Sequence, residues 1–308
     1  MLTMDKLKSY IFLSTAQIAF ALNVICGKVL VEALPTLSFI TIRFFFGALS
    51  LFLIMLLTRD QIFKNRKTSS LNKADIINIF LQAFSAGFLF NLIFYLGLDY
   101  TTATSAGIIS SSLPGIIAIM AVLILKERLN KQKVFALFVS ICGILCISID
   151  NTIAVDGPRG SYLGDFLIFI SLIPEAFYSV LSKRSANKLS PLFTAFIINI
   201  LAFLLMLPIA FTQLKTVNFT HLIYSNVLFY LTLAGFCGAL FFWLWPLGLL
   251  KVPASEAAIF GGIVPIACSI FAVLILNETF KVNDGLGLFC VVLSIYISNA
   301  KFVKPSKT

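Results

Sequence analysis

The sequence predicts an all-α integral membrane protein of ten transmembrane helices, arranged as two inverted five-helix repeats. Three observations predict it. The 308-residue chain is 59% hydrophobic and 12% charged, with a mean hydropathy of +1.01, so it carries more apolar surface than a soluble domain of this length can bury. Continuous apolar runs of about 20 residues recur along the chain. Part of the first half also returns, in altered form, in the second half.

Each apolar run can cross about 30 Å of hydrocarbon as a helix, and its continuous character excludes the alternating strands of a barrel. The first half would occupy residues 1–149 and the second 162–308, joined by a linker at 150–161. The first residues lead into a full-length apolar run with no good small-residue cleavage site, so we expect a retained helix rather than a signal peptide. The expected spans are 9–31, 36–57, 74–98, 102–125, 132–149, 162–182, 191–211, 226–250, 254–276 and 284–301.

The internal repeat brings residues 96–149 back 151 positions later. The heptapeptide A-V-L-I-L-K-E at 121–127 returns as A-V-L-I-L-N-E at 272–278, and Pro265 follows Pro114 in the same register. An odd number of spans in each half would invert the second half relative to the first. Inverted repeats allow a site between the halves to open to either side of the membrane. Pro114 and Pro265 are therefore candidate structural or gating residues.

Basic residues predict the orientation of the chain. With the N-terminus inside the cell, 18 of the 23 Lys and Arg residues fall on the inner side of the ten-span arrangement. We expect a multi-pass protein of the inner (plasma) membrane with both termini cytoplasmic. The formal charge of +10 is thereby accounted for, and no separate basic domain indicates nucleic-acid binding. The expected partners are a small-molecule substrate and the lipid bilayer. The sequence does not exclude a homodimer, and we expect the monomer to be the functional unit.

Motifs in both halves resemble one known family. They are I-T-I-R-F-F-F-G-A in the second span, T-S-A-G-I-I-S-S-S-L-P-G in the fourth and A-S-E-A-A-I-F-G-G-I-V-P in the ninth, and they resemble the EamA branch of the drug/metabolite transporter superfamily. The resemblance covers residues 9–301 and implies a ten-span carrier of amino acids, other metabolites, quaternary amines, drugs or nucleotide-linked compounds. Asn199 stands where the second half would echo Arg43, which predicts an asymmetric role for this arginine.

Ionisable side chains within spans are candidates for a transport path, because burying one in the membrane costs about 3 kcal/mol on insertion scales. Glu175 lies deep in the sixth span, after Pro174, and would contact a substrate amine, carry a proton or bond to a neighbouring helix. Arg43 would tie the second span to a neighbour or reach the headgroups. Glu256, at the start of the ninth span, fits helix capping and transport equally well. Glu127 is expected to be a turn or capping group.

Polar and aromatic side chains near the middle of the spans complete the predicted substrate site. Their amides, hydroxyls and rings suit an amphipathic metabolite or a cation–π contact. Trp245, which precedes Pro246, is expected in the interfacial aromatic belt instead. Small residues before Pro114 and Pro265 predict thin, locally broken helices. The candidates beside Glu175 are Gln17, Asn23, Asn91, Tyr95, Ser111, Tyr178 and Trp243.

An enzymatic function has little support in the sequence. The single histidine, His221, falls in an outside loop, and the chain has no HExxH, Walker loop or Cys/His cluster. We expect no metal, no cofactor and no ATP hydrolysis. The predicted function is secondary transport of small metabolites by alternating access, either as uniport or coupled to protons. Amino acids or related amines are the first candidates as substrates. The alternative is a membrane-embedded receptor or accessory subunit that binds a ligand without transport.

Overall fold

The computed structural model describes residues 4–58, 72–98, 100, 109, 112–127, 131–132, 134–139, 141–142, 162–186, 190–217, 226–276, 285–286, 289–290, 293–294 and 296–297, and these form helices without strands. Leu113–Leu125 is a short apolar helix, and seven further helical segments are long and apolar enough to cross a membrane. They are Met4–Gly27, Thr36–Leu57, Lys73–Gly97, Leu163–Ser185, Pro191–Leu214, Val227–Leu249 and Ala254–Ile275. The all-α membrane class is thereby confirmed. About half of each of the predicted spans at 132–149 and 284–301 lies outside the described residues.

In the first half, the third span is built from three consecutive segments. Its first segment begins with a capping box, in which the side chain of Asn72 accepts from the backbone N–H of Asp75 at 2.9 Å. The middle segment is a π-helix, a wider coil that often marks functional sites inside long helices. The helices of this half are α1 (Met4–Ala33), α2 (Thr36–Leu57), α4 (Lys73–Gln82), the π-helix η1 (Ala83–Phe90), α5 (Asn91–Leu98) and α7 (Leu113–Leu125).

In the second half, the ninth span is broken where small residues predict it. A single α-turn is followed by a 3-10 segment that ends at Gly262, and the α-helix then resumes. Prolines lie within the three preceding helices, as membrane helices tolerate. The helices of this half are α9 (Tyr162–Ser185), α10 (Pro191–Leu214), α12 (Val227–Leu249), α13 (Ala254–Ala257), the 3-10 helix η2 (Ala258–Gly262) and α14 (Ile263–Leu276).

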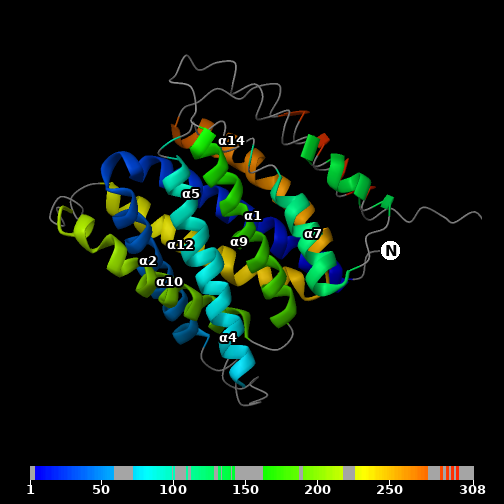
Figure 1. Ribbon diagram of the computed structural model, residues 1–308, viewed down its shortest axis with the longest axis horizontal. Helices are drawn as coiled ribbons and strands as arrows, with labels where there is room; N and C mark the ends of the chain where they lie inside the picture. The colour runs from blue at the N-terminus through cyan, green and yellow to red at the C-terminus, as the bar shows by residue number, and fades with distance from the viewer. Residues whose placement is uncertain are drawn as a thin grey trace, which may run out of the picture.

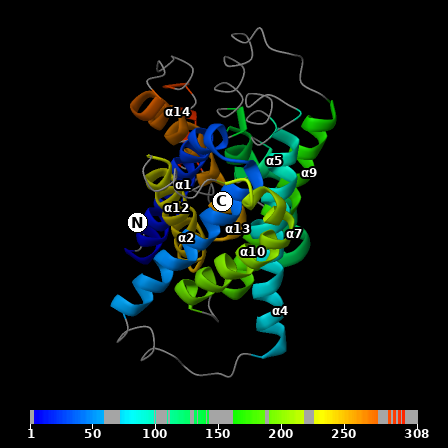
Figure 2. The same cartoon turned by 90° about the vertical axis from the view of Figure 1, so that its left-hand side faces the viewer.

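The helices pack as two groups joined by a central pair. In the first group α1 packs along α12 and α14, and in the second α9 packs along α4, η1, α5 and α7. Figure 2 shows the first group on one side of the bundle and the second on the other, and Figure 1 shows α9 flanked by α5 and α7. The central pair is α2 and α10, which contact each other, with α2 against α12 and α10 against η1. Each group therefore combines the first helix of one half with later helices of the other.

Apolar side chains cover the outside of the bundle as well as its core. Large residues such as Leu57, Leu204 and Phe229 are more than half exposed on the helices that carry them, whereas Leu51 and Met206 on the inner faces are fully buried. A helix that is apolar all round must be buried in protein and lipid together. The exposed residues therefore form the lipid-facing surface of a multi-pass membrane protein.

A close crossing of α2 and α12 depends on Gly235. A Cβ atom added there would lie 2.7 Å from the carbonyl oxygen of Arg43 and from the Cβ of Phe46. We expect Gly235→Ala to push the helices apart and to cost about 1–3 kcal/mol, seen as a lower melting temperature in detergent. Gly115→Ala is the matched control, because its methyl group would meet Ile141 at an ordinary 3.7 Å. Equal melting temperatures for the two variants would contradict this account.

Candidate functional site

Arg43 lies at the centre of the bundle, where it ties three helices together. Its side chain is only 6% exposed. The Nη1 group donates to Oδ1 of Asn23 on α1 at 3.0 Å, and Nη2 donates to Oδ1 of Asn91 on α5 at 2.7 Å. The ring of Phe44 lies 4.7 Å from the guanidinium carbon, within reach of a cation–π contact. The sequence candidates Asn23, Arg43 and Asn91 thus form one hydrogen-bonded triad.

The π-helix explains why Asn91 can hold Arg43. The Asn91 side chain donates through Nδ2 to the backbone carbonyls of Ala86 at 2.7 Å and Gly87 at 3.1 Å. Both carbonyls belong to η1, where the wider coil leaves them available to a side chain. With its amide nitrogen fixed in this way, Asn91 must present its oxygen to the guanidinium. The irregular segment therefore orients the arginine through one asparagine.

A small cavity opens beside this triad, and both halves of the chain line it. Two of its residues are charged, Arg43 from α2 and Glu175 from α9, and both are more than nine-tenths buried. Gly235 and Gly238 line the cavity on α12, where they place no side chain in it. The remaining wall alternates amides with aromatic rings, supplied by Phe20, Asn23, Phe44, Ala86, Phe90, Asn91, Asn199, Phe241 and Phe242.

The two charges of the cavity are not paired with each other. Within the described part of the chain, Arg43 and Glu175 form no salt bridge within 4.0 Å, the ion pair there being Lys6–Glu256. The guanidinium uses Nη1 and Nη2 in its bonds to asparagines, while Nε has no hydrogen-bond partner. The cavity therefore offers one cation and one anion, each able to take a further group of opposite charge.

The cavity brings together some of the predicted substrate-site residues and leaves others elsewhere in the bundle. Asn23, Asn91 and Glu175 meet on its wall. Gln17, Tyr95, Tyr178 and Trp243 do not line it, although they lie on α1, α5, α9 and α12, which also frame the site. Ser111 falls outside the described residues. Of the predicted structural residues, Arg43 lies on the cavity, Pro114 is buried at the start of α7 and Pro265 lies within α14.

The prediction that Trp245 belongs to an interfacial belt is wrong. Its side chain is 2% exposed and stacks on Phe241 with ring centroids 5.8 Å apart. Pro246, which follows it, does not end the helix, and α12 continues to Leu249. The indole therefore stays on a helix of the core. Trp243, by contrast, is only partly buried at the edge of the same core.

Sequence reasoning missed Asn199 and the aromatic walls of the cavity. The signal for the walls was present in the repeat, since Phe241 and Phe242 follow Phe90 and Asn91 by the same 151 positions, and all four line the cavity. Asn199 is the residue that replaces an arginine in the second half, and it lines the cavity together with Arg43. Equivalent positions of the two halves thus line the same site.

A second polar cluster closes the bundle at the end that carries Lys6, Lys183 and Lys251, called here the basic end. The ammonium of Lys6 lies 2.9 Å from Oε1 of Glu256, and the hydroxyl of Tyr10 donates to the same oxygen at 2.6 Å. Glu256 therefore ties α13 to α1, and its carboxylate is occupied there. Lys183 donates to the backbone carbonyls at the end of α12, those of residues 249 and 252, at 2.5 and 2.8 Å.

Glu127 caps a helix of the opposite half. Its Oε1 accepts from the backbone N–H of Ala254 at 2.8 Å, and its Oε2 accepts from the N–H of Ser255 at 3.2 Å and the Ser255 hydroxyl at 2.6 Å. The left-handed conformation of Lys126 ends α7 and turns the glutamate toward α13. A carboxylate at a helix N-terminus satisfies free N–H groups and the helix dipole together. We call this contact of Glu127 with Ala254 and Ser255 the latch.

Comparisons with known proteins agree with the geometry of a membrane transporter. The sequence profile of the EamA-like transporter family matches residues 7–149 and again residues 162–300. The uncharacterized transporter YetK of Bacillus subtilis (strain 168) is 29% identical over 307 residues, which is 99% of this chain and 90% of that protein. An uncharacterized transporter of Clostridium kluyveri is 24% identical over 96% of this chain and 94% of its own length. These relatives are named as transporters without a substrate.

A solved crystal structure has the same fold. It superposes with a TM-score of 0.75 over 94% of this chain and 96% of that chain, at 14% sequence identity. At this identity the likeness extends to the arrangement of the helices alone. It shows that the arrangement of helices around α2 and α10 also occurs in another protein.

Proposed function

Since this chain belongs to the EamA-like transporter family, and is therefore a multi-pass membrane transporter, we propose that it is a secondary carrier of small metabolites that works by alternating access. Amino acids or related amines are the first candidates as substrates, moved by uniport or together with protons. The proposal includes ten spans in two inverted halves, a plasma-membrane location and cytoplasmic termini.

The observation that carries the substrate proposal is the pair of charges that line one cavity without forming a salt bridge with each other. An amino acid carries a carboxylate and an ammonium group close together, and Arg43 and Glu175 offer a partner to each. The rings of Phe241 and Phe242 supply an apolar surface for a side chain or a cationic group. Few precisely placed polar groups within a mainly aromatic wall are typical of small-molecule sites.

The contacts between helices support two inverted halves. If the halves exchange, α1 takes the place of α9, α12 that of the third span and α14 that of α7. The packing of α1 along α12 and α14 then corresponds to the packing of α9 along α5 and α7. The exchange also replaces α2 by α10 and η1 by α12, so the contact of α2 with α12 corresponds to that of α10 with η1. The contact between α2 and α10 is unchanged by the exchange. A site on such a pseudo-two-fold axis can be reached from either side by exchanging the two conformations.

The clustered lysines support the orientation, and the latch supports a closed inner side. Lys6, Lys183 and Lys251, which the positive-inside rule assigns to the cytoplasm, lie at one end of the bundle. At this end Glu127 and Glu256 bind α13 to α7 and α1. We therefore assign the basic end to the cytoplasm and the latch to the inner gate of the carrier.

Flux in liposomes tests the carrier and the role of Glu175 together. The experiment measures uptake of radiolabelled amino acids, choline-like amines and nucleotides, with and without a pH gradient. A carboxyl group on the cavity can exchange a proton with either side, so Glu175→Gln should remove any dependence of flux on the gradient. Asp165→Asn is the matched control, because Asp165 lies at the start of the same helix and off the cavity.

The outcomes separate the three readings of the site. Saturable flux that depends on the pH gradient in the parent protein and in Asp165→Asn, but not in Glu175→Gln, supports a proton-coupled carrier. Saturable flux with no such dependence in any of them supports a uniporter, in which Glu175 binds substrate or holds the fold. Specific binding by the folded protein without flux of any compound would contradict the carrier and favour the receptor.

A further inference from the structure

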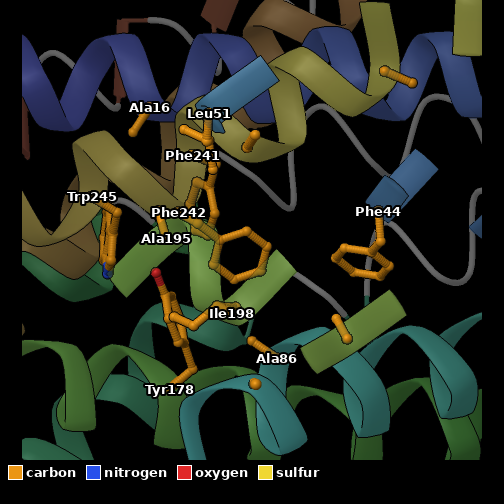
Figure 3. Packing of buried hydrophobic residues seen from close by; sticks show 14 of the residues in the cluster. Ala16, Phe44, Leu51, Ala86, Tyr178, Ala195, Ile198, Phe241, Phe242 and Trp245 are labelled. Carbon is orange, nitrogen blue, oxygen red and sulfur yellow. The ribbon is translucent and has the colours of Figure 1, made fainter. Parts of the chain in front are cut away.

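Tyr178 and Trp245 each carry a buried hydrogen-bond donor that has no acceptor among the described residues. Tyr178 on α9 is fully buried and Trp245 on α12 is 2% exposed. Neither the hydroxyl of Tyr178 nor Nε1 of Trp245 has a hydrogen-bond partner among the described residues. Figure 3 shows the hydroxyl and the indole nitrogen directed into the same space between their helices.

Leaving these donors unpaired is energetically costly. A buried donor without an acceptor costs about 1–3 kcal/mol, and such groups in native proteins call for an explanation. The hydroxyl of Ser182, one turn along α9, donates to Oε1 of Gln82 at 3.0 Å and does not meet the Tyr178 hydroxyl in hydrogen-bonding geometry. Two adjacent donors from different helices are best explained by an acceptor that both can share.

The pair adjoins the central cavity on the side of the basic end. Phe242 meets the Tyr178 ring edge to face at 5.3 Å and Phe241 stacks on Trp245 at 5.8 Å, and both phenylalanines line the cavity. Along α9, Tyr178 lies one turn beyond Glu175 and before Lys183, which bonds the end of α12 at the basic end. The two donors therefore lie between the cavity and the basic end.

We propose that Tyr178 and Trp245 form a second subsite, which takes a carboxylate or carbonyl oxygen of the substrate between the cavity and the basic end. The inference rests on the proposed carrier function and specifies the route that the substrate takes through the carrier. The indole can only donate, so the group it meets must be an acceptor and not an ammonium. A carboxylate can accept from both residues at once. The substrate would thus pass its acid group from Arg43 to this pair when the basic end opens.

Intrinsic fluorescence tests the subsite, because the chain has two tryptophans and one can be removed. In the Trp243→Phe protein the emission reports on Trp245 alone. We titrate it in detergent with L-leucine, or the amino acid that gives the highest flux in liposomes, and with the amine made by its decarboxylation. Adding Tyr178→Phe should raise the Kd of the amino acid about tenfold, the effect of one lost charged hydrogen bond, and leave that of the amine unchanged. Ser182→Ala is the matched control and should change neither value.

Folding and function are checked separately. Removing a buried donor that has no acceptor in the protein should not lower the melting temperature, so Tyr178→Phe is expected to stay folded. If the parent protein transports the amino acid but Tyr178→Phe binds acid and amine with unchanged Kd values, or weakens both equally, the subsite is overturned and the carrier stands. If the parent transports nothing, the carrier proposal fails, and the subsite falls with it.

Discussion

Replacing Arg43 with methionine should lower kcat/KM for transport at least about a hundredfold, because this guanidinium is the cation of the cavity. Methionine fills a similar length without charge, so Asn23 and Asn91 lose the donors at 3.0 and 2.7 Å that fix their oxygens. Leaving a buried amide oxygen without its donor costs about 1–3 kcal/mol. The measurement is concentration-dependent uptake of radiolabelled substrate in liposomes.

Arg43→Lys separates charge from geometry. Lysine keeps the positive charge but has a compact ammonium, which cannot span both asparagine oxygens as the forked guanidinium does. We expect an intermediate loss, about tenfold, with most of the change in KM. A melting curve in detergent establishes that each variant is folded. Normal transport by a folded Arg43→Met protein would show that Arg43 only holds α2 to its neighbours.

Sequence patterns were enough to predict what depends on local chemistry. Apolar runs gave the membrane class, and small residues around Gly261 and Gly262 gave the broken ninth span, which is realised as α13, η2 and α14. The cavity residues Asn23, Asn91 and Glu175 were also predictable, because polar groups are costly within apolar spans and must find partners there.

Features that depend on contacts between distant helices could not be predicted. The π-helix has no clear sequence signature, since residues 83–90 form an ordinary apolar run, and it is the bond from Asn91 that satisfies its carbonyls. Trp245 was misplaced because Pro246 suggested a helix end, whereas packing against Phe241 continues α12 past it. Glu127 was expected to cap or turn locally, but it caps α13, a partner that only the folded arrangement brings near.

Glu127→Gln should open the basic end. The carboxylate accepts three hydrogen bonds from Ala254 and Ser255, and an amide in its place turns a donor toward at least one of them. Because bonds to charged groups contribute about 1.5–3 kcal/mol each, losing about 2 kcal/mol would shift the closed-to-open ratio on the order of thirtyfold. Trp245 lies between the cavity and this end, so opening should expose it to water. Iodide quenching of Trp245 in the Trp243→Phe background measures the shift.

The matched control is Asp75→Asn, because Asp75 caps the first turn of its own helix and bonds to no other helix among the described residues. It should leave the quenching of Trp245 unchanged, whereas Glu127→Gln should raise the quenching constant severalfold. Equal quenching of the two variants would exclude the latch as a gate and make Glu127 a purely structural cap. Its repeat counterpart, Glu278, lies outside the described residues. If the halves are inverted, Glu278→Gln should weaken the opposite end of the carrier. Opening that end favours closure of the basic end, so the quenching of Trp245 should fall.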